Sequence, residues 1–185
     1  MEGASSFTDV PGWGLVIVGV TAVAVSPLAY AQPSAGRWLL AWLVEAVVAA
    51  VIAVAFIWRK ARRRATAEDR PVFGIAARKF MLGLCPAILA GAVLTFALID
   101  FETMWQSGTK VPRVIPGLWL LLYGVSVVTA GAYSVRAVPT MGIGFMLLGV
   151  AALFMHTLPG DFMLAMGFGV LHLIAGVFIA WRHGG

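Results

Sequence analysis

The chain has 185 residues, of which 61% are hydrophobic and only 11% are charged, and its formal net charge is +5. A soluble domain needs roughly a quarter of charged residues to cover its surface, so this composition excludes a soluble globular protein. The single cysteine, Cys85, excludes an intrachain disulfide and a metal site built from cysteines.

Six apolar stretches follow one another along the chain, and each is long enough to cross a bilayer. About twenty helical residues, at roughly 1.5 Å per residue, cross a hydrocarbon core about 30 Å thick. We therefore expect an all-α fold, a polytopic transmembrane helical bundle that forms a single membrane domain over residues 1–185. Its expected spans are 12–31, 38–58, 80–100, 114–134, 139–157 and 162–181.

The first stretch ends in an Ala-Tyr-Ala motif at 29–31, which resembles a signal-peptidase site. The residues ahead of the stretch include Glu2 and Asp9 but no lysine or arginine, unlike the basic start of a signal peptide. We therefore expect 12–31 to be kept as the first span.

Positive charge is concentrated between the second and third stretches, in the expected loop 59–79. The lysines and arginines of this loop are Arg59, Lys60, Arg62, Arg63, Arg64, Arg70, Arg78 and Lys79. The positive-inside rule places such a loop in the cytoplasm, and six spans then place both termini there. Because the first five of these residues follow a span directly, we expect them to contact anionic lipid headgroups. The alternative is that the loop is a docking site for nucleic acid or protein. Of these two partners, we expect that nucleic acid is not one.

Six of the seven tryptophans lie near the ends of expected spans: Trp13, Trp38, Trp42, Trp58, Trp105 and Trp181. This placement is typical of an aromatic belt that anchors helices at the membrane–water interface. Trp119 lies one turn inside the fourth span.

Small residues recur on one face of three spans, a pattern that lets membrane helices approach closely. The stripes are Gly83, Ala87 and Gly91 in the third span, Gly117, Gly124 and Gly131 in the fourth, and Ala165, Gly169, His172 and Gly176 in the sixth. Three such stripes predict a tight bundle.

The first and fourth spans share the pattern Pro-Gly-x-x-Leu-x-x-x-Gly-Val-[Thr/Ser]-x-Val, at 11–23 and 116–128. In a six-span chain these helices run in opposite directions, as in the inverted three-plus-three repeat of many transporters. Coincidence in a chain rich in glycine, valine and leucine is the alternative, because the basic loop has no counterpart in the second half.

Two ionisable side chains, Glu45 and His172, lie well inside spans, where a charge costs about 2.5–3.5 kcal/mol at the centre on insertion scales. Both lie on stripes of small residues, so they should point into the bundle, and Tyr123, Ser126 and Thr95 fall in the same half of the membrane. One hypothesis is an outward-facing polar pocket that exchanges a proton or senses pH. The alternative is that Glu45 and His172 bond each other or a backbone carbonyl and only fix helix register.

Catalytic and metal-binding patterns are missing from the sequence. No nucleophile–base pair, phosphate-binding glycine loop or convergent ligand set can be recognised, so we expect no catalytic residue, no metal and no cofactor. Asp100, Glu102, His156 and Asp161 are expected at the outer rim, where charged residues are ordinary.

The second half of the chain contains PGLWLLLYGVSVVTAGAYSVRAVPTMGIGFMLLG at 116–149 and GFGVLHLIAGVFIAWRHGG at 167–185. These segments resemble an uncharacterised family of small bacterial six-span integral membrane proteins with no assigned activity. The resemblance is best over 116–185. It implies a multi-pass protein of the bacterial cytoplasmic (inner) membrane, and it implies no substrate and no catalytic residue.

Three classes of function stay open. The short loops and sparse buried polarity favour a membrane interaction or regulatory module, or an accessory subunit, whose partner is another protein or a second copy. The inverted repeat and the polar residues favour a small proton-linked transporter or a ligand sensor. A membrane enzyme ranks last because no catalytic constellation is visible.

Overall fold

The computed structural model describes residues 10–68, 75–155 and 157–183, and the chain is helical almost throughout these ranges. The elements are α1 (Gly12–Tyr30), α2 (Ala35–Glu68), α3 (Ile75–Leu98), α4 (Val114–Gly131), α5 (Ala137–Phe154), α6 (Gly160–Leu164), the π-helical segment η1 (Ala165–Leu171) and α7 (His172–His183). Because α6, η1 and α7 are continuous, they form one span. The described residues thus contain six helices long and apolar enough to cross a membrane, which confirms the predicted helical bundle. The chain is a multi-pass integral membrane protein.

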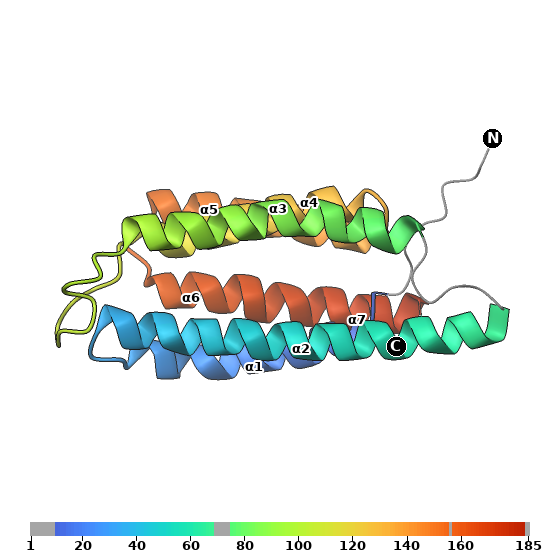
Figure 1. The fold of residues 1–185 in the computed structure, drawn as a ribbon, viewed down its shortest axis with the longest axis horizontal. Coiled ribbons are helices and arrows are strands. Elements are labelled where there is room, and N and C mark those ends of the chain that lie inside the picture. Colours follow the sequence, from blue (N-terminus) through green and yellow to red (C-terminus); the bar gives the residue numbers. More distant parts are fainter. Residues whose placement is uncertain (1–9, 69–74, 156, 184–185) are drawn as a thin grey trace.

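The helices form two layers, with α3, α4 and α5 in one and α1 and α2 in the other (Figure 1). The last span packs against α1 and also against α4 and α5, so it joins the two layers. By contrast, α2 packs mainly against α1, and α3 packs mainly against α4. Both therefore lie at the edge of the bundle.

Glycines bring α1 and the last span into close contact. A Cβ added at Gly19 would lie 2.8 Å from the carbonyl oxygen of Gly169, and one added at Gly176 would lie 2.8 Å from that of Gly12. Such approaches leave no room for a side chain at these glycine positions. The seven-residue spacing of these glycines keeps them on one face of an antiparallel pair.

The same arrangement recurs between α4 and α5. A Cβ added at Gly124 would lie 2.8 Å from the carbonyl oxygen of Gly142, and one added at Gly149 would lie 3.0 Å from that of Gly117. Gly131 faces Pro139 at a similar distance of 2.7 Å. In a three-plus-three repeat, α1 would use its glycine face against α2, the counterpart of α5. It uses that face against the last span instead, so the glycine contacts do not follow the repeat.

The helix α2 continues far beyond its apolar stretch. It has 34 residues, and at about 1.5 Å per residue it is roughly 50 Å long, well over a hydrocarbon core of about 30 Å. The expected loop 59–79 is therefore helical from Arg59 to Glu68, because alanine, arginine and lysine all favour a helix. Residues 69–74 of that loop lie outside the described ranges.

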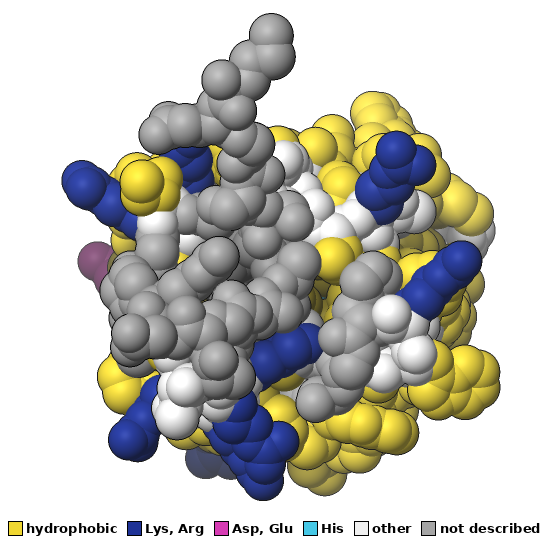
Figure 2. Space-filling view, turned by 90° about the vertical axis from the view of Figure 1, so that its right-hand side faces the viewer, with side chains coloured by type: hydrophobic (Ala, Val, Ile, Leu, Met, Phe, Trp, Pro, Cys, Tyr) yellow, Lys and Arg dark blue, Asp and Glu magenta, His cyan; other side chains and the backbone are white. Residues whose placement is uncertain are grey.

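One end of the bundle carries the start of α1 and the ends of α2 and α7, and we call it the basic end (Figure 1). Figure 2 looks onto this end and shows lysine and arginine side chains around its rim. Three of these cations lie over aromatic rings: Arg62 over Trp58 at 5.9 Å, Lys79 over Tyr133 at 5.5 Å and Arg182 over Phe178 at 5.7 Å. These contacts hold the charged groups beside apolar surface.

The opposite end is covered by residues 99–112. The backbone N–H of Gly36 donates to the carbonyl of Met104 at 2.7 Å, and that of Gly108 donates to the carbonyl of Pro33 at 2.8 Å. Gly108 has a φ of 88°, which only glycine adopts readily. The Thr103 hydroxyl donates to Asp100 at 2.8 Å and lowers the pKa of this exposed carboxyl group. Together these bonds fix the segment onto the turn between α1 and α2.

Candidate functional site

A cluster of polar side chains lies near the end of the bundle opposite the basic end, around Asp161. The indole N–H groups of Trp38 and Trp42 both donate to its Oδ1 atom, at 2.7 and 2.9 Å. The hydroxyl of Ser26 donates to the backbone carbonyl of the same residue at 3.1 Å. One residue at the start of α6 thus binds α1 and α2 together.

A second set of contacts extends this cluster to α3 and α4. The ring of Trp119 stacks on that of Trp38, with 5.5 Å between centroids and 27° between planes. Its indole N–H donates to the hydroxyl of Thr95 at 2.7 Å, and that hydroxyl donates to the carbonyl of Gly91, also at 2.7 Å. We call Ser26, Trp38, Trp42, Thr95, Trp119 and Asp161 the Asp161 network, and it links five of the six spans.

The predicted interfacial position of Trp38 and Trp42 is wrong. Their exposed fractions are 7% and 3%, so both rings lie inside the bundle rather than among lipid headgroups. The physical reason is the carboxylate of Asp161, which satisfies two indole N–H groups and lets both rings be buried. The sequence did contain a signal: the two tryptophans are four residues apart on one helix face, and an acidic residue begins the last span.

The second polar site is a pair formed by His172 and Tyr123 in the centre of the bundle. Nδ1 of His172 lies 2.9 Å from the carbonyl oxygen of Phe168, and Nε2 lies 3.0 Å from the hydroxyl of Tyr123. A carbonyl oxygen only accepts, so Nδ1 of the neutral ring carries the proton, and Tyr123 donates to Nε2. His172 is 2% exposed, and its ring contacts those of Phe145 and Phe168.

The π-helical segment η1 explains how His172 finds its backbone partner. The backbone N–H of His172 donates to the carbonyl of Gly169 and leaves that of Phe168 to the imidazole. Gly167 lets the Leu120 side chain of α4 pack against this segment, because a Cβ there would lie 2.3 Å from that side chain. Short π-helical segments are rare and are frequent at functional sites.

Glu45 has a different partner from the one considered in the sequence. It is 6% exposed, and its Oε1 atom accepts a hydrogen bond of 2.8 Å from the hydroxyl of Thr21 on α1. The same hydroxyl lies 2.9 Å from the carbonyl oxygen of Val18. A hydroxyl carries one proton, so Thr21 donates to one of these oxygens at a time.

The structure therefore divides the predicted pocket of Glu45, His172, Tyr123, Ser126 and Thr95 into separate places. Tyr123 and His172 form a pair, Thr95 belongs to the Asp161 network, and Glu45 joins α2 to α1. Ser126 lies one turn from Tyr123 on α4 and is fully buried. Its Oγ atom forms no hydrogen bond with the described residues.

The basic residues predicted to contact lipid differ in where they point. Arg59, Arg62 and Arg63 are exposed on α2, whereas Lys60 turns back and donates to the carbonyl of Val10 at 3.3 Å. The side chain of Arg64 lies outside the described part, as does His156 at the expected outer rim. The predicted stripe glycines Gly83, Gly91, Gly117, Gly124, Gly131, Gly169 and Gly176 all face neighbouring spans.

Over the described ranges, no three His, Cys, Asp or Glu side chains gather where they could hold a metal ion. Comparison of the chain with known protein families, with curated proteins and with solved structures finds no match. The resemblance of 116–185 to a family of small bacterial membrane proteins therefore stays a prediction. The polar groups described above act mainly on one another, through bonds between helices.

Proposed function

We propose that this protein is an interaction module or accessory subunit of a bacterial cytoplasmic membrane. In this proposal the basic end faces the cytoplasm, so both termini are cytoplasmic, and a partner protein docks in the membrane on the side formed by α2 and α3. The positive-inside rule supports this orientation.

The observation that carries the proposal is the uneven burial of the six spans. In the most apolar stretches of α2 and α3 only 11% of the residues are buried, against 50% in α4 and 44% in the last span. Helices with so little contact inside their own chain depend on lipid or on a partner for the rest of their surface. A partner helix on this side would bury what the bundle leaves open.

The interior of the bundle supports the same function. Glu45, His172 and Asp161 each accept a hydrogen bond from a side chain on another helix. Such bonds fix the arrangement of helices and leave the described interior with no set of groups poised for a reaction.

Photo-crosslinking in native membranes tests the proposal. Benzoylphenylalanine would replace Val93 on α3 or Val44 on α2, and Leu147 on α5 serves as the control, since Val93 and Leu147 are 68% and 67% exposed. We expect a protein adduct of defined mass at Val93 or Val44 and only lipid adducts at Leu147. Lipid adducts alone at all three positions would contradict the proposal.

The second candidate function is a proton-linked transporter or ligand sensor. The buried pair of Tyr123 and His172, with the fully buried hydroxyl of Ser126 one turn away, favours it. Proton uptake by the purified protein in liposomes tests this candidate. Glu45→Gln or His172→Gln should abolish a real proton-linked signal, and the same signal in these folded variants would remove the candidate.

A further inference from the structure

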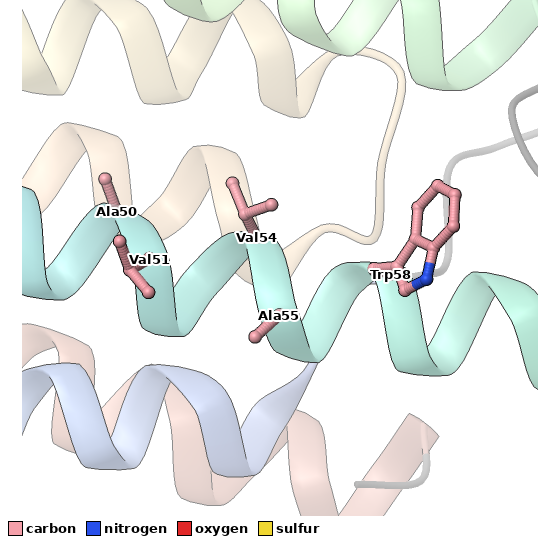
Figure 3. Close-up of a pocket in the computed structure, with 5 residues that line it drawn as sticks. All are labelled: Ala50, Val51, Val54, Ala55 and Trp58. Atoms are coloured by element: carbon pink, nitrogen blue, oxygen red, sulfur yellow. The ribbon is translucent and has the colours of Figure 1, made fainter.

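An apolar trough lies along the exposed surface of α2, and its shape and surroundings suit a lipid ligand. The trough is shallow and open, has a volume of about 550 Å³, and is lined by Ala50, Val51, Val54, Ala55 and Trp58 (Figure 3). These residues share one face of the helix, because they recur at three- and four-residue intervals. The trough runs from near the middle of α2 to Trp58, which lies toward the basic end.

The length of the trough fits one leaflet of a bilayer. From Ala50 to Trp58 the helix rises about 12 Å at roughly 1.5 Å per residue, and half of a hydrocarbon core is about 15 Å. Valine and alanine side chains offer a smooth surface to an acyl chain. Trp58 then lies where the hydrocarbon ends, the depth at which tryptophan is enriched in membrane proteins.

Positive charge lies directly beyond the trough. Arg62 follows Trp58 by one helical turn, and its guanidinium group lies 5.9 Å from the centre of the Trp58 ring. Arg59 lies at the edge of the same face, and both arginines are exposed. No carboxylate of the described residues pairs with either guanidinium group.

We propose that this face of α2 is a binding site for one anionic phospholipid. An acyl chain lies in the trough, and the phosphate of the headgroup accepts hydrogen bonds from Arg62 and Arg59. Arginine suits this task because its planar donors match phosphate oxygens in pairs. The apolar trough and the positive charge beyond it together favour a lipid that has both an acyl chain and an anionic headgroup.

This inference is independent of the proposed protein partner, since it requires only that α2 crosses the membrane. It also differs from general attraction of lipids to a basic surface. Such attraction would draw equally on Arg136, which directly precedes α5, and on Arg182 in α7, both exposed near the same end. A defined site instead depends on the two arginines that border the trough.

Native mass spectrometry of the full chain in detergent tests the site, with dioleoyl phosphatidylglycerol and dioleoyl phosphatidylcholine as probes. Each lysine or arginine near an anionic surface contributes a factor of about five in affinity. We therefore expect one phosphatidylglycerol to bind about thirty-fold more tightly than phosphatidylcholine, from two such factors. Arg59→Gln with Arg62→Gln should remove that preference, whereas Arg136→Gln with Arg182→Gln should keep it.

A second pair of variants tests the apolar part. Val54→Trp places a bulky ring in the trough and should weaken binding of both lipids, while Leu147→Trp on α5, at a similarly exposed position, should not. Equal loss of preference in the two double arginine variants would overturn the proposal and indicate diffuse attraction. Unchanged affinity of Val54→Trp for both lipids would overturn the proposal that an acyl chain lies in the trough.

Discussion

Asp161 should be the most sensitive polar residue of the bundle, because its Oδ1 atom accepts two indole hydrogen bonds of 2.7 and 2.9 Å from buried rings. A hydrogen bond to a charged group contributes about 1.5–3 kcal/mol, so two contribute about 3–6 kcal/mol. Asp161 is only half-buried, and water can replace part of this loss. We expect Asp161→Ala to lower the free energy of unfolding by about 3 kcal/mol.

Two milder variants separate the charge from the hydrogen bonds. Asp161→Asn keeps an oxygen that can accept both N–H groups and loses only the charge assistance, so its loss should be about 1 kcal/mol. Trp42→Phe removes one donor and should cost about 1.5 kcal/mol or more. Trp181→Phe is the control, because Trp181 is 83% exposed, and it should change nothing measurable.

The measurement is unfolding in mixed micelles of mild detergent and dodecyl sulfate, followed by circular dichroism so that loss of a tryptophan does not alter the signal. A double-mutant cycle of Asp161→Ala with Trp42→Phe should give a coupling energy of about 1–2 kcal/mol. Additive losses in that cycle, or an Asp161→Ala variant as stable as the original, would refute the argument that this carboxylate holds the two rings.

Three further predictions follow from other contacts. Gly124→Ala should lower the free energy of unfolding by about 1–3 kcal/mol, because its Cβ would press on the backbone of α5. Gly91→Ala is the control and should leave that free energy unchanged in the same assay, since its Cβ would lie 3.5 Å from its nearest neighbour. Tyr123→Phe should lower the free energy of unfolding by about 1–3 kcal/mol, since it leaves Nε2 of His172 buried without a donor. Tyr133→Phe on the surface is the control. Equal stability of the two variants would contradict the pairing of Tyr123 with His172. In a Cys85→Ala background, a membrane-impermeant maleimide should label Ser107→Cys in intact cells and Thr66→Cys only after lysis, and the reverse pattern would overturn the proposed orientation.

The six spans could be predicted because crossing a bilayer imposes a length and an apolar composition that the sequence shows directly. The stripe of Gly117, Gly124 and Gly131 also indicated a helix contact, since seven-residue spacing places small residues on one face. The helix that each stripe meets could not be predicted. Periodicity describes one helix at a time, whereas the partner depends on how all six pack.

The polar site was harder to predict for the same reason. Glu45 and Thr21 both lie in apolar helices, and nothing in their spacing relates one to the other. Tyr123 and His172 were placed in one half of the membrane, but the sequence did not indicate the π-helical segment that directly precedes His172. Trp38 and Trp42 were misplaced because a tryptophan near a span end has two stable positions, at the interface or inside beside an acceptor.

The shared pattern of α1 and α4 has a physical explanation that does not require a repeated transport unit. Each helix supplies glycines at seven-residue intervals, Gly12 and Gly19 in one and Gly117 and Gly124 in the other. Each stripe meets an antiparallel helix whose own glycines expose backbone carbonyls at 2.8–3.2 Å from the added Cβ positions of Gly19, Gly124 and Gly117. Glycines at this spacing stay on one face and allow such close packing, so packing alone accounts for the shared glycines. Since the partners are the last span in one case and α5 in the other, the similarity indicates one packing solution used twice. A bundle whose centre is held by two such contacts can leave α2 and α3 at its edge, available to a lipid or a partner.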